Sequence, residues 1–422
     1  MSNPNILVKI KALTKEYFES QRQEFEPGKS KVKLSAIYGW EEAAEAMDSL
    51  LTTWVTMGKK VKLFEELFSK YIGVKYGVMV NSGSSANLLA LSILTNPAIN
   101  DRLKPGDEVI TPAVTWSTTV FPIANMGLKP VLADVDIETL NINTDEIRKG
   151  LTGKTKAIMP VHLIGNPCDM DEIMQIAEEN GLYVIEDACE AHGAEYKGKK
   201  VGSIGDMGTY SFFMSHHITT IEGGMVMTDN EEFAEMGRAL RVFGWIRDLK
   251  DKEETAAKYP FIDKRFLFKT PGYNLRPTEI SGAFGIQQIK KIENFVKARK
   301  ENADYWNSAL SKYSQYLVLP EERPNTRHAW FGYPVTIKQD APFTREQMIS
   351  FLESKNIETR PIMAGNIAEQ PAMKEIDHKV IGDLKNSRLI MRRSFFWGNH
   401  QDIKKPQREY VAQVVSEFME KY

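Results

Sequence analysis

The chain has 422 residues, of which 42% are hydrophobic and 26% are charged, and its formal net charge is −2. This composition is ordinary for a globular protein with more than one domain, and the charge gives no electrostatic case for binding nucleic acid or a membrane surface. Its 2 cysteines, Cys168 and Cys189, make a disulfide framework improbable. With no signal-peptide pattern and no bilayer-length apolar run, a cytoplasmic location is expected.

The chain first shows helical periodicity and then a regular alternation of strands and helices. Helices are predicted over residues 42–55 and 63–71. Short apolar strands are then predicted at 76–81, 108–112, 130–135, 157–163 and 183–187, with helices between them at 88–94, 118–125, 144–151 and 170–180. Two more strands follow at 210–213 and 224–228. This alternation indicates βαβ units around a mainly parallel sheet.

A long helix predicted over residues 282–310 separates this part from the C-terminal part. There a strand at 330–335 and helices at 344–355 and 409–421 indicate a smaller α+β domain. We therefore expect N-terminal helices and a large α/β domain in residues 1–290, and a small C-terminal domain in residues 291–422.

Small residues follow the first predicted strand, in the sequence Asn81-Ser-Gly-Ser-Ser-Ala-Asn87. The free N–H groups at the start of a helix bind phosphate, and Gly83 and Ser84 would let an anion come close. An ordinary capped turn explains this pattern equally well when it is taken alone.

The segment Glu186-Asp-Ala-Cys-Glu-Ala-His192 closes another apolar strand. Open α/β sheets bind ligands at the carboxyl ends of their strands, where a carboxylate such as Asp187 can hold a pyridine nitrogen protonated. A helix cap or turn is the alternative role for an aspartate in this position.

Two adjacent histidines, His216 and His217, lie between Ser211-Phe-Phe and Glu222-Gly-Gly. Neighbouring side chains point in different directions, and no cysteine or histidine at helical spacing accompanies them. No metal site is therefore expected here, and a structural role is the alternative for each histidine.

Together with Pro105-Gly-Asp-Glu-Val-Ile-Thr-Pro and Asp134-Val-Asp136, these motifs resemble the nucleotide-sugar aminotransferases related to aspartate aminotransferase. The resemblance runs from about Trp54 to the C-terminus. It implies the fold type I of pyridoxal 5′-phosphate (PLP) enzymes, with a mainly parallel seven-stranded-type sheet flanked by helices. In this family a lysine that bonds covalently to PLP lies where this chain has His216.

Histidine in place of that lysine resembles the family's 3-dehydratase branch. An imidazole forms no stable bond with the PLP aldehyde, but it can act as an acid or base near neutral pH. The resemblance implies a lyase of deoxysugar and lipopolysaccharide O-antigen biosynthesis. Glutamate would convert PLP to pyridoxamine 5′-phosphate (PMP), and the enzyme would remove the C3 hydroxyl of a nucleotide-linked 4-keto-6-deoxyhexose and release ammonia.

The resemblance also implies a role for each matching position. Gly83, Ser84 and Ser211 would bind the cofactor phosphate, Trp116 would stack on the ring, and Asp187 would pair with the ring nitrogen. Glu190 would lie near the cofactor, and His216 would be the catalytic base. Asn274 would reach the phosphate in a partner subunit, which implies a homodimer with shared sites. Weaker expectations place His217 and Arg276 beside the site, and Arg247, Arg360 and His400 near the sugar nucleotide.

Cysteine usage separates the two kinds of enzyme in this branch. The kind that acts on CDP-4-keto-6-deoxyglucose holds an iron–sulfur cluster on cysteines, whereas residues 242–274 of this chain contain none. GDP-4-keto-6-deoxymannose is therefore the favoured substrate. The alternatives are an ordinary aminotransferase that uses another lysine, a cluster-dependent dehydrase, and an inactive nucleotide-sugar-binding homologue.

Overall fold

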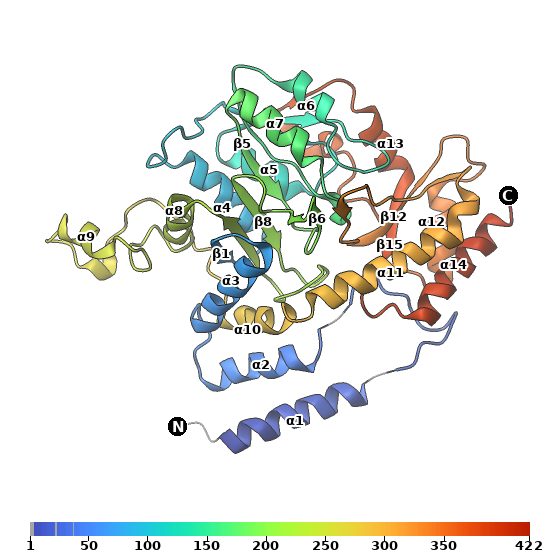
Figure 1. Cartoon of the computed structure of the whole chain (residues 1–422), viewed down its shortest axis with the longest axis horizontal. Helices are drawn as coiled ribbons and strands as arrows, with labels where there is room; N and C mark the ends of the chain where they lie inside the picture. Colours follow the sequence, from blue (N-terminus) through green and yellow to red (C-terminus); the bar gives the residue numbers. More distant parts are fainter. Residues whose placement is uncertain (1–3, 22, 37) are drawn as a thin grey trace.

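The computed structural model describes residues 4–21, 23–36 and 38–422. Its centre is an eight-stranded sheet in the order β1-β9-β8-β5-β4-β2-β3-β14 (Figure 1). β9 is antiparallel to both of its neighbours, and the other adjacent pairs are parallel. The bounds are β1 (Tyr76–Val80), β2 (Glu108–Pro112), β3 (Lys129–Ala133), β4 (Thr155–Ile158), β5 (Tyr183–Asp187), β8 (Met207–Ser211), β9 (Gly224–Thr228) and β14 (Lys379–Val380). The prediction of a mainly parallel sheet is confirmed, and the C-terminal part adds the short eighth strand β14.

Helices cover both faces of this sheet, which is why strands such as β2 are buried along their whole length. The flanking helices are α3 (Lys59–Ile72), α4 (Gly83–Thr95), α5 (Ser117–Asn125), α6 (Thr144–Gly150), α7 (Met170–Asn180) and α8 (Glu231–Arg241). A small three-stranded sheet, β11-β6-β7, lies beside them and is formed by β6 (Glu195–Tyr196), β7 (Lys199–Lys200) and β11 (Thr326–Arg327).

The C-terminal part contains a second sheet of four strands, β10-β12-β15-β13. Its strands are β10 (Leu317–Val318), β12 (Gly332–Ile337), β13 (Thr359–Pro361) and β15 (Ser394–Gly398), and its helices are α11 (Ile292–Leu310), α12 (Arg345–Ser354), α13 (Lys385–Arg393) and α14 (Lys405–Met419). Trp306, Tyr333 and Trp397 are fully buried in its core. The boundary at residues 290/291 stays a prediction, and β14 crosses it to join the large sheet.

The single long helix predicted over residues 282–310 is wrong, because the chain forms α10 (Glu279–Gln288) and α11 with a break between them. Tertiary contacts account for the break. A Cβ atom on Gly285 would lie 2.5 Å from the Phe64 ring, so α10 packs closely on α3. Beside the break, Gln288 and Lys291 both bond to the buried Glu42, while α11 continues toward the small domain.

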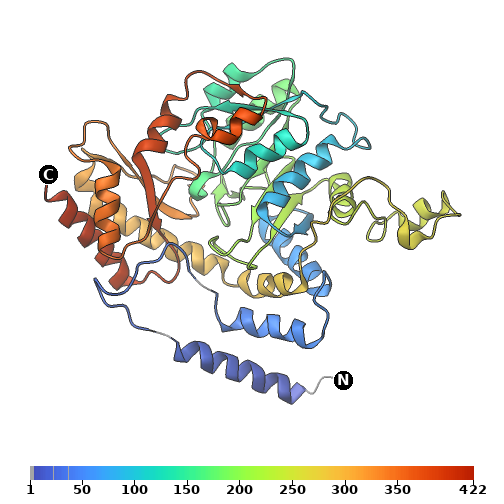
Figure 2. The same cartoon turned by 180° about the vertical axis from the view of Figure 1, so that it is seen from behind.

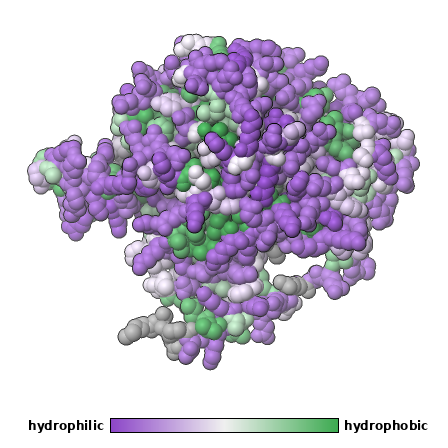
Figure 3. Space-filling view, in the orientation of Figure 1, coloured by the Kyte–Doolittle hydropathy of each residue, from purple (hydrophilic) through white to green (hydrophobic). Residues whose placement is uncertain are grey.

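Two further segments lie outside these layers. α1 (Pro4–Ser20) packs on α2 (Trp40–Leu51), below α10 in Figure 1. α9 (Lys252–Ala257) projects from the body together with the loops around it, as Figures 1 and 2 both show. Figure 3 shows a largely hydrophilic face with separate apolar patches. Among the described residues, no helix combines the length and apolar character needed to cross a membrane.

Candidate active site

A cavity of about 320 Å³ lies where β1, β5 and β8 end at the same edge of the large sheet. This edge is the place where open α/β sheets bind ligands. The C-terminal part contributes Phe331 and Met363 to its lining. Seven of the eight predicted site residues line this cavity, namely Gly83, Ser84, Trp116, Asp187, Glu190, Ser211 and His216; Asn274 does not.

The end of the cavity at α4 has the chemistry of an anion site. Ser82 caps α4 by accepting the Ser85 N–H at 3.1 Å, so the N–H groups of Gly83 and Ser84 are left for a ligand. The Ser211 side chain lies directly across, since a Cβ atom on Gly83 would approach the Ser211 Cβ to 2.4 Å. A phosphate group fits this cradle of main-chain donors and hydroxyls.

Gly83→Ala is expected to weaken cofactor binding, because its methyl group cannot be placed without moving Ser211 and the start of α4. We expect a loss in affinity of at least about tenfold, the equivalent of one lost hydrogen bond. Fluorescence titration of the apoenzyme with PLP measures it. Gly153→Ala is the matched control, since a Cβ atom there meets nothing within 4 Å. Equal affinity in the two variants would remove the phosphate site from the start of α4.

Asp187 lies at the floor of the cavity, at the end of β5, with its carboxylate held by neighbours. Oδ2 accepts hydrogen bonds from Asn87 Nδ2 at 2.9 Å and from Thr119 Oγ1 at 2.8 Å. Oδ1 accepts the Cys189 N–H at 3.2 Å, and a carboxylate oxygen has a further lone pair that a ligand can use. A buried carboxylate fixed in this way suits a protonated ring nitrogen.

His216 lies on the wall of the cavity, between the loop that follows β8 and the C-terminal part. Its ring centroid is 5.2 Å from that of Phe331 and 5.9 Å from that of His192. Burial, together with the positive charge of Arg299, lowers the pKa of His216 to about 3. The imidazole is therefore uncharged at neutral pH, and its buried Nδ1 has no hydrogen-bond partner among the described residues. The uncharged ring therefore has a nitrogen that is open to a ligand and can take a proton from it.

His217 points away from the cavity and has a structural partner. Its Nε2 donates a hydrogen bond to the carbonyl oxygen of Ala329, at 2.8 Å. Burial lowers the pKa of His217 well below its usual value. This hydrogen bond ties the loop that carries His216 to the C-terminal part.

Glu190 enters the cavity from the turn after β5. One of its oxygens accepts the Ile164 N–H at 2.8 Å. Burial raises the pKa of Glu190 to about 8, and this single hydrogen bond offsets only part of the effect. At neutral pH the side chain is therefore mostly a neutral acid that can donate a hydrogen bond into the cavity.

Glu190→Gln is accordingly expected to keep most activity at pH 7, because an amide resembles the protonated acid. The wild-type pH profile should change near pH 8, where Glu190 ionises, and this change should be absent from the variant. The folded state binds the proton of Glu190 more tightly than the unfolded chain does. Wild type should therefore lose up to about 4 kcal/mol relative to Glu190→Gln between pH 4.5 and 8. Parallel urea denaturation at several pH values measures this difference, and identical pH dependence would show that Glu190 is ionised throughout.

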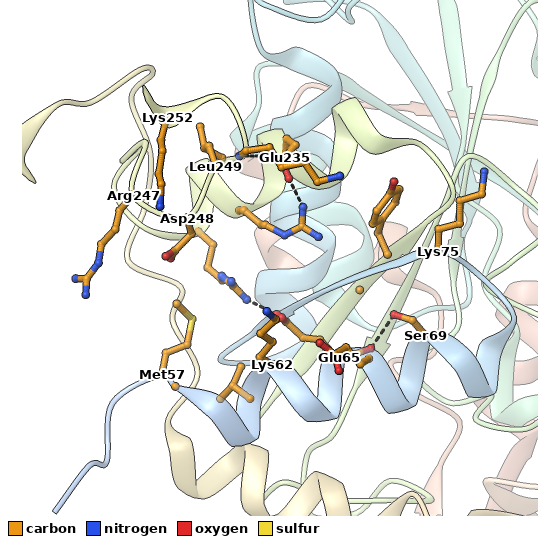
Figure 4. A pocket seen from close by; sticks show the side chains of 18 residues that line it. Met57, Lys62, Glu65, Ser69, Lys75, Glu235, Arg247, Asp248, Leu249 and Lys252 are labelled. Atoms are coloured by element: carbon orange, nitrogen blue, oxygen red, sulfur yellow. Dashed lines mark hydrogen bonds and ion pairs between the residues drawn. The ribbon is translucent and has the colours of Figure 1, made fainter. Parts of the chain in front are cut away.

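Three more residues that the sequence analysis named lie in three different places. Trp116 precedes α5 and stays 53% exposed at the cavity mouth, where a ring could stack on it. Asn274 is exposed outside the cavity and accepts a hydrogen bond from Arg276 Nε at 2.9 Å. Arg247 lines a separate cavity of about 530 Å³ between α3 and α8 (Figure 4).

The expectation for His400 is not supported. Its Nε2 bonds to the Lys33 carbonyl at 3.0 Å, and its Nδ1 accepts the Asp402 N–H at 3.3 Å. Both ring nitrogens are therefore used within the protein. Arg360 is exposed and donates to the Thr359 carbonyl at 2.8 Å, outside the cavity.

Several residues of the site had no role predicted from sequence. Asn87 and Thr119 hold Asp187. Both lie in segments that the sequence analysis discussed, but neither residue was given a role there. Phe331 and Met363 line the cavity without any local signal in the sequence, since their place depends on how the C-terminal part folds over the large sheet.

The fold and this pocket define an α/β enzyme that uses PLP: the phosphate cradle, the carboxylate at the floor and the cavity between them fit that cofactor. The chain belongs to the DegT/DnrJ/EryC1/StrS aminotransferase family, whose model matches residues 37–416. Within the described residues, no cluster of three or more histidine, cysteine or acidic side chains is arranged to hold a metal.

Individual members of the family show which enzymes this chain is similar to. The chain is 41% identical over 350 residues to a GDP-4-keto-6-deoxy-D-mannose 3-dehydratase of Yersinia pseudotuberculosis, and the matched region covers 82% of this chain and 88% of that protein. It is 37% identical over 433 residues to a dTDP-4-dehydro-2,6-dideoxy-D-glucose 3-dehydratase of Saccharopolyspora spinosa, with 99% and 93% covered. A crystal structure of GDP-4-keto-6-deoxymannose-3-dehydratase with a trapped PLP-glutamate geminal diamine superposes with a TM-score of 0.86, at 38% identity over 92% of this chain and 100% of that one.

Proposed function

We propose that this chain is a PLP/PMP-dependent 3-dehydratase of a nucleotide-linked 4-keto-6-deoxyhexose, with GDP-4-keto-6-deoxymannose as its favoured substrate. The observation that carries the proposal is His216, an uncharged imidazole in the cofactor cavity at the position where aminotransferases of this kind carry a lysine. The relatives named 3-dehydratases support the reaction, and the structure with PLP-glutamate supports glutamate as the amino donor.

The residues of the cavity divide the chemistry between them. When bound, the cofactor would supply a reactive amine and an electron-accepting ring. Asp187 would keep the ring nitrogen protonated, and the start of α4 would hold the phosphate. His216 would move a proton from the C4′ carbon of the cofactor to the departing C3 hydroxyl.

No lysine is among the residues that line the cavity. No amine of the protein therefore competes there for the cofactor aldehyde. Once released from the cofactor, the sugar enamine left by the loss of the C3 hydroxyl would tautomerise and hydrolyse, which releases ammonia. Overall, one hydroxyl of the sugar is replaced by hydrogen while glutamate becomes 2-oxoglutarate and ammonia, so atoms and electrons balance.

The direct test is incubation of the PLP-loaded enzyme with glutamate and GDP-4-keto-6-deoxymannose. Ammonia and the 3-deoxy keto sugar should appear in equal amounts, and iron and sulfide should be absent from the protein. An aminated sugar without ammonia would identify an aminotransferase, and turnover that requires iron and a reductase would identify a cluster-dependent dehydrase. Binding without any product would identify an inactive homologue. The matching CDP- and dTDP-linked sugars, run in parallel, establish the nucleotide preference.

A homodimer with shared sites is part of the same proposal. Asn274 lies on the surface at the base of the projecting arm, residues 246–270, and does not line the cavity of its own subunit. The arm also exposes aromatic side chains, among them Phe261 at 83% and Phe266 at 62%. Exposed aromatic residues are typical of surfaces that a protein partner covers. The two free cysteines suit a cytoplasmic enzyme.

Mixing two inactive variants tests the shared sites. Asn274→Asp places a negative charge against the partner's cofactor phosphate, and His216→Asn removes the base. After unfolding and refolding together, the mixed dimers should contain one intact site each, so roughly a quarter of wild-type activity should return. Activity of the refolded mixture, compared with each variant refolded alone, is the measurement. No recovery, with wild type refolding normally, would place Asn274 and His216 in the same subunit's site or outside it.

A further inference from the structure

Arg299 is a buried cation that lies outside the lining of the catalytic cavity. It lies on α11 and is 1% exposed. Its Nη1 donates to the carbonyls of Trp330 at 3.1 Å and Phe331 at 2.9 Å, and also to that of Asn399. These three partners are carbonyls, and the Asp402 carboxylate acts on the guanidinium electrostatically, which offsets part of the cost of burying the charge.

A charge in such a place is costly, since burial lowers the pKa of Arg299 to about 9. The guanidinium is still protonated at neutral pH. Packing alone would be served by an uncharged side chain of similar size, so the retained charge needs another explanation.

The residues that Arg299 binds connect it to the catalytic cavity through a chain of contacts. Phe331, whose carbonyl it binds, presents its ring to His216 at 5.2 Å and to His217 at 5.9 Å. The Phe331 N–H donates to the Ile164 carbonyl at 2.9 Å, and the Ile164 N–H in turn donates to Glu190. One guanidinium thus fixes a segment that supports both the histidine and the glutamate of the cavity.

We propose that Arg299 is a positioning residue for His216, which holds Phe331 against the imidazole and keeps that ring uncharged in the resting enzyme. The inference rests on the proposed function of His216 as a base. A base that is already protonated cannot take a proton, so a fixed positive charge behind the ring preserves the competent form. The titratable and charged groups around the ring, from the described elements that surround it, are Asp187, Cys189, Glu190, His192, His217, Glu222 and Arg299, and Asp402 of the C-terminal part acts on Arg299.

The test uses two variants of Arg299 and an observable that does not depend on turnover. Histidine labelled with ¹³C at Cε1 reports the protonation of each ring by NMR, and the His216→Asn variant assigns the signal. Arg299→Gln removes the charge but keeps a donor, whereas Arg299→Lys keeps the charge. In the full-length enzyme with PLP, the protonated fraction of His216 at pH 5 should rise about tenfold in Arg299→Gln and stay at the wild-type value in Arg299→Lys.

Turnover provides the second observable. In Arg299→Gln the acid limb of the pH–rate profile should move up by about one pH unit from its wild-type position, and Arg299→Lys should restore that position. A purely structural role predicts lower thermal stability and an equal loss of rate at every pH in both variants, and that result would overturn the proposal. If Arg299→Gln yields no folded protein, Arg299→Lys decides alone: a changed titration of His216 despite the retained charge would overturn it, and an unchanged one supports it. Wild type without dehydratase activity would contradict the proposed function instead, while the NMR comparison still applies to Arg299.

Discussion

His216→Asn is expected to lower the rate of dehydration by about 10²- to 10⁴-fold, the usual contribution of a general base, while cofactor binding stays unchanged. Asparagine has a similar shape but no basic nitrogen. The buried Nδ1 of His216 has no partner among the described residues, so the substitution breaks no hydrogen bond seen there. The cofactor is held elsewhere, by Asp187 and the start of α4. Single-turnover formation of the 3-deoxy sugar and a PLP titration measure the two quantities separately.

Two matched variants make this experiment decisive. His217→Asn removes the neighbouring imidazole and its bond to the Ala329 carbonyl, so it should lower stability by about 1–3 kcal/mol and affect the rate much less. His216→Lys places an amine at the same position, and borohydride should then fix PLP to residue 216, which peptide mass spectrometry detects. An undiminished rate in His216→Asn, or a larger loss in His217→Asn, would assign the base to another group.

The parts of the site that sequence could anticipate are those fixed by local structure. The segment from Asn81 to Asn87 joins a strand to a helix, and Asp187 ends a strand, so both had to lie at the carboxyl edge of a parallel sheet. His216 was identified through the family resemblance, because an imidazole alone does not reveal its role. In each case the residue's neighbours in sequence determine where it lies.

What sequence could not anticipate depends on contacts between distant segments. Arg299 stands among charged residues in α11 and reads as a surface residue, yet the C-terminal part buries it. The break after Gln288 contains neither glycine nor proline, and its cause is packing against α2 and α3. His400 was expected near the substrate because of its motif, but the Lys33 carbonyl from the N-terminal segment takes up its Nε2.

The second large effect is expected at the floor of the cavity. In Asp187→Asn the donors Asn87 and Thr119 both require an acceptor, so the amide oxygen should take the place of Oδ2. The amide nitrogen then replaces Oδ1, loses the hydrogen bond from the Cys189 N–H, and donates to the ring nitrogen, which stays unprotonated and no longer draws electrons strongly. Loss of a buried charge pair of this kind costs about 2–5 kcal/mol, so turnover should fall by about thirtyfold or more.

Excess PLP should not restore the rate of Asp187→Asn, because the defect lies in the ring's electronic state as well as in affinity. Thr119→Val is the matched control, because it removes one donor to Asp187 but keeps the carboxylate. Its dehydration rate should fall by about tenfold. Dehydration rates at saturating PLP, with the dissociation constant of PLP for each variant, separate the two contributions. If Asp187→Asn turns over at the wild-type rate once it is saturated with cofactor, the ring nitrogen needs no carboxylate partner and Asp187 serves only to position Asn87 and Thr119.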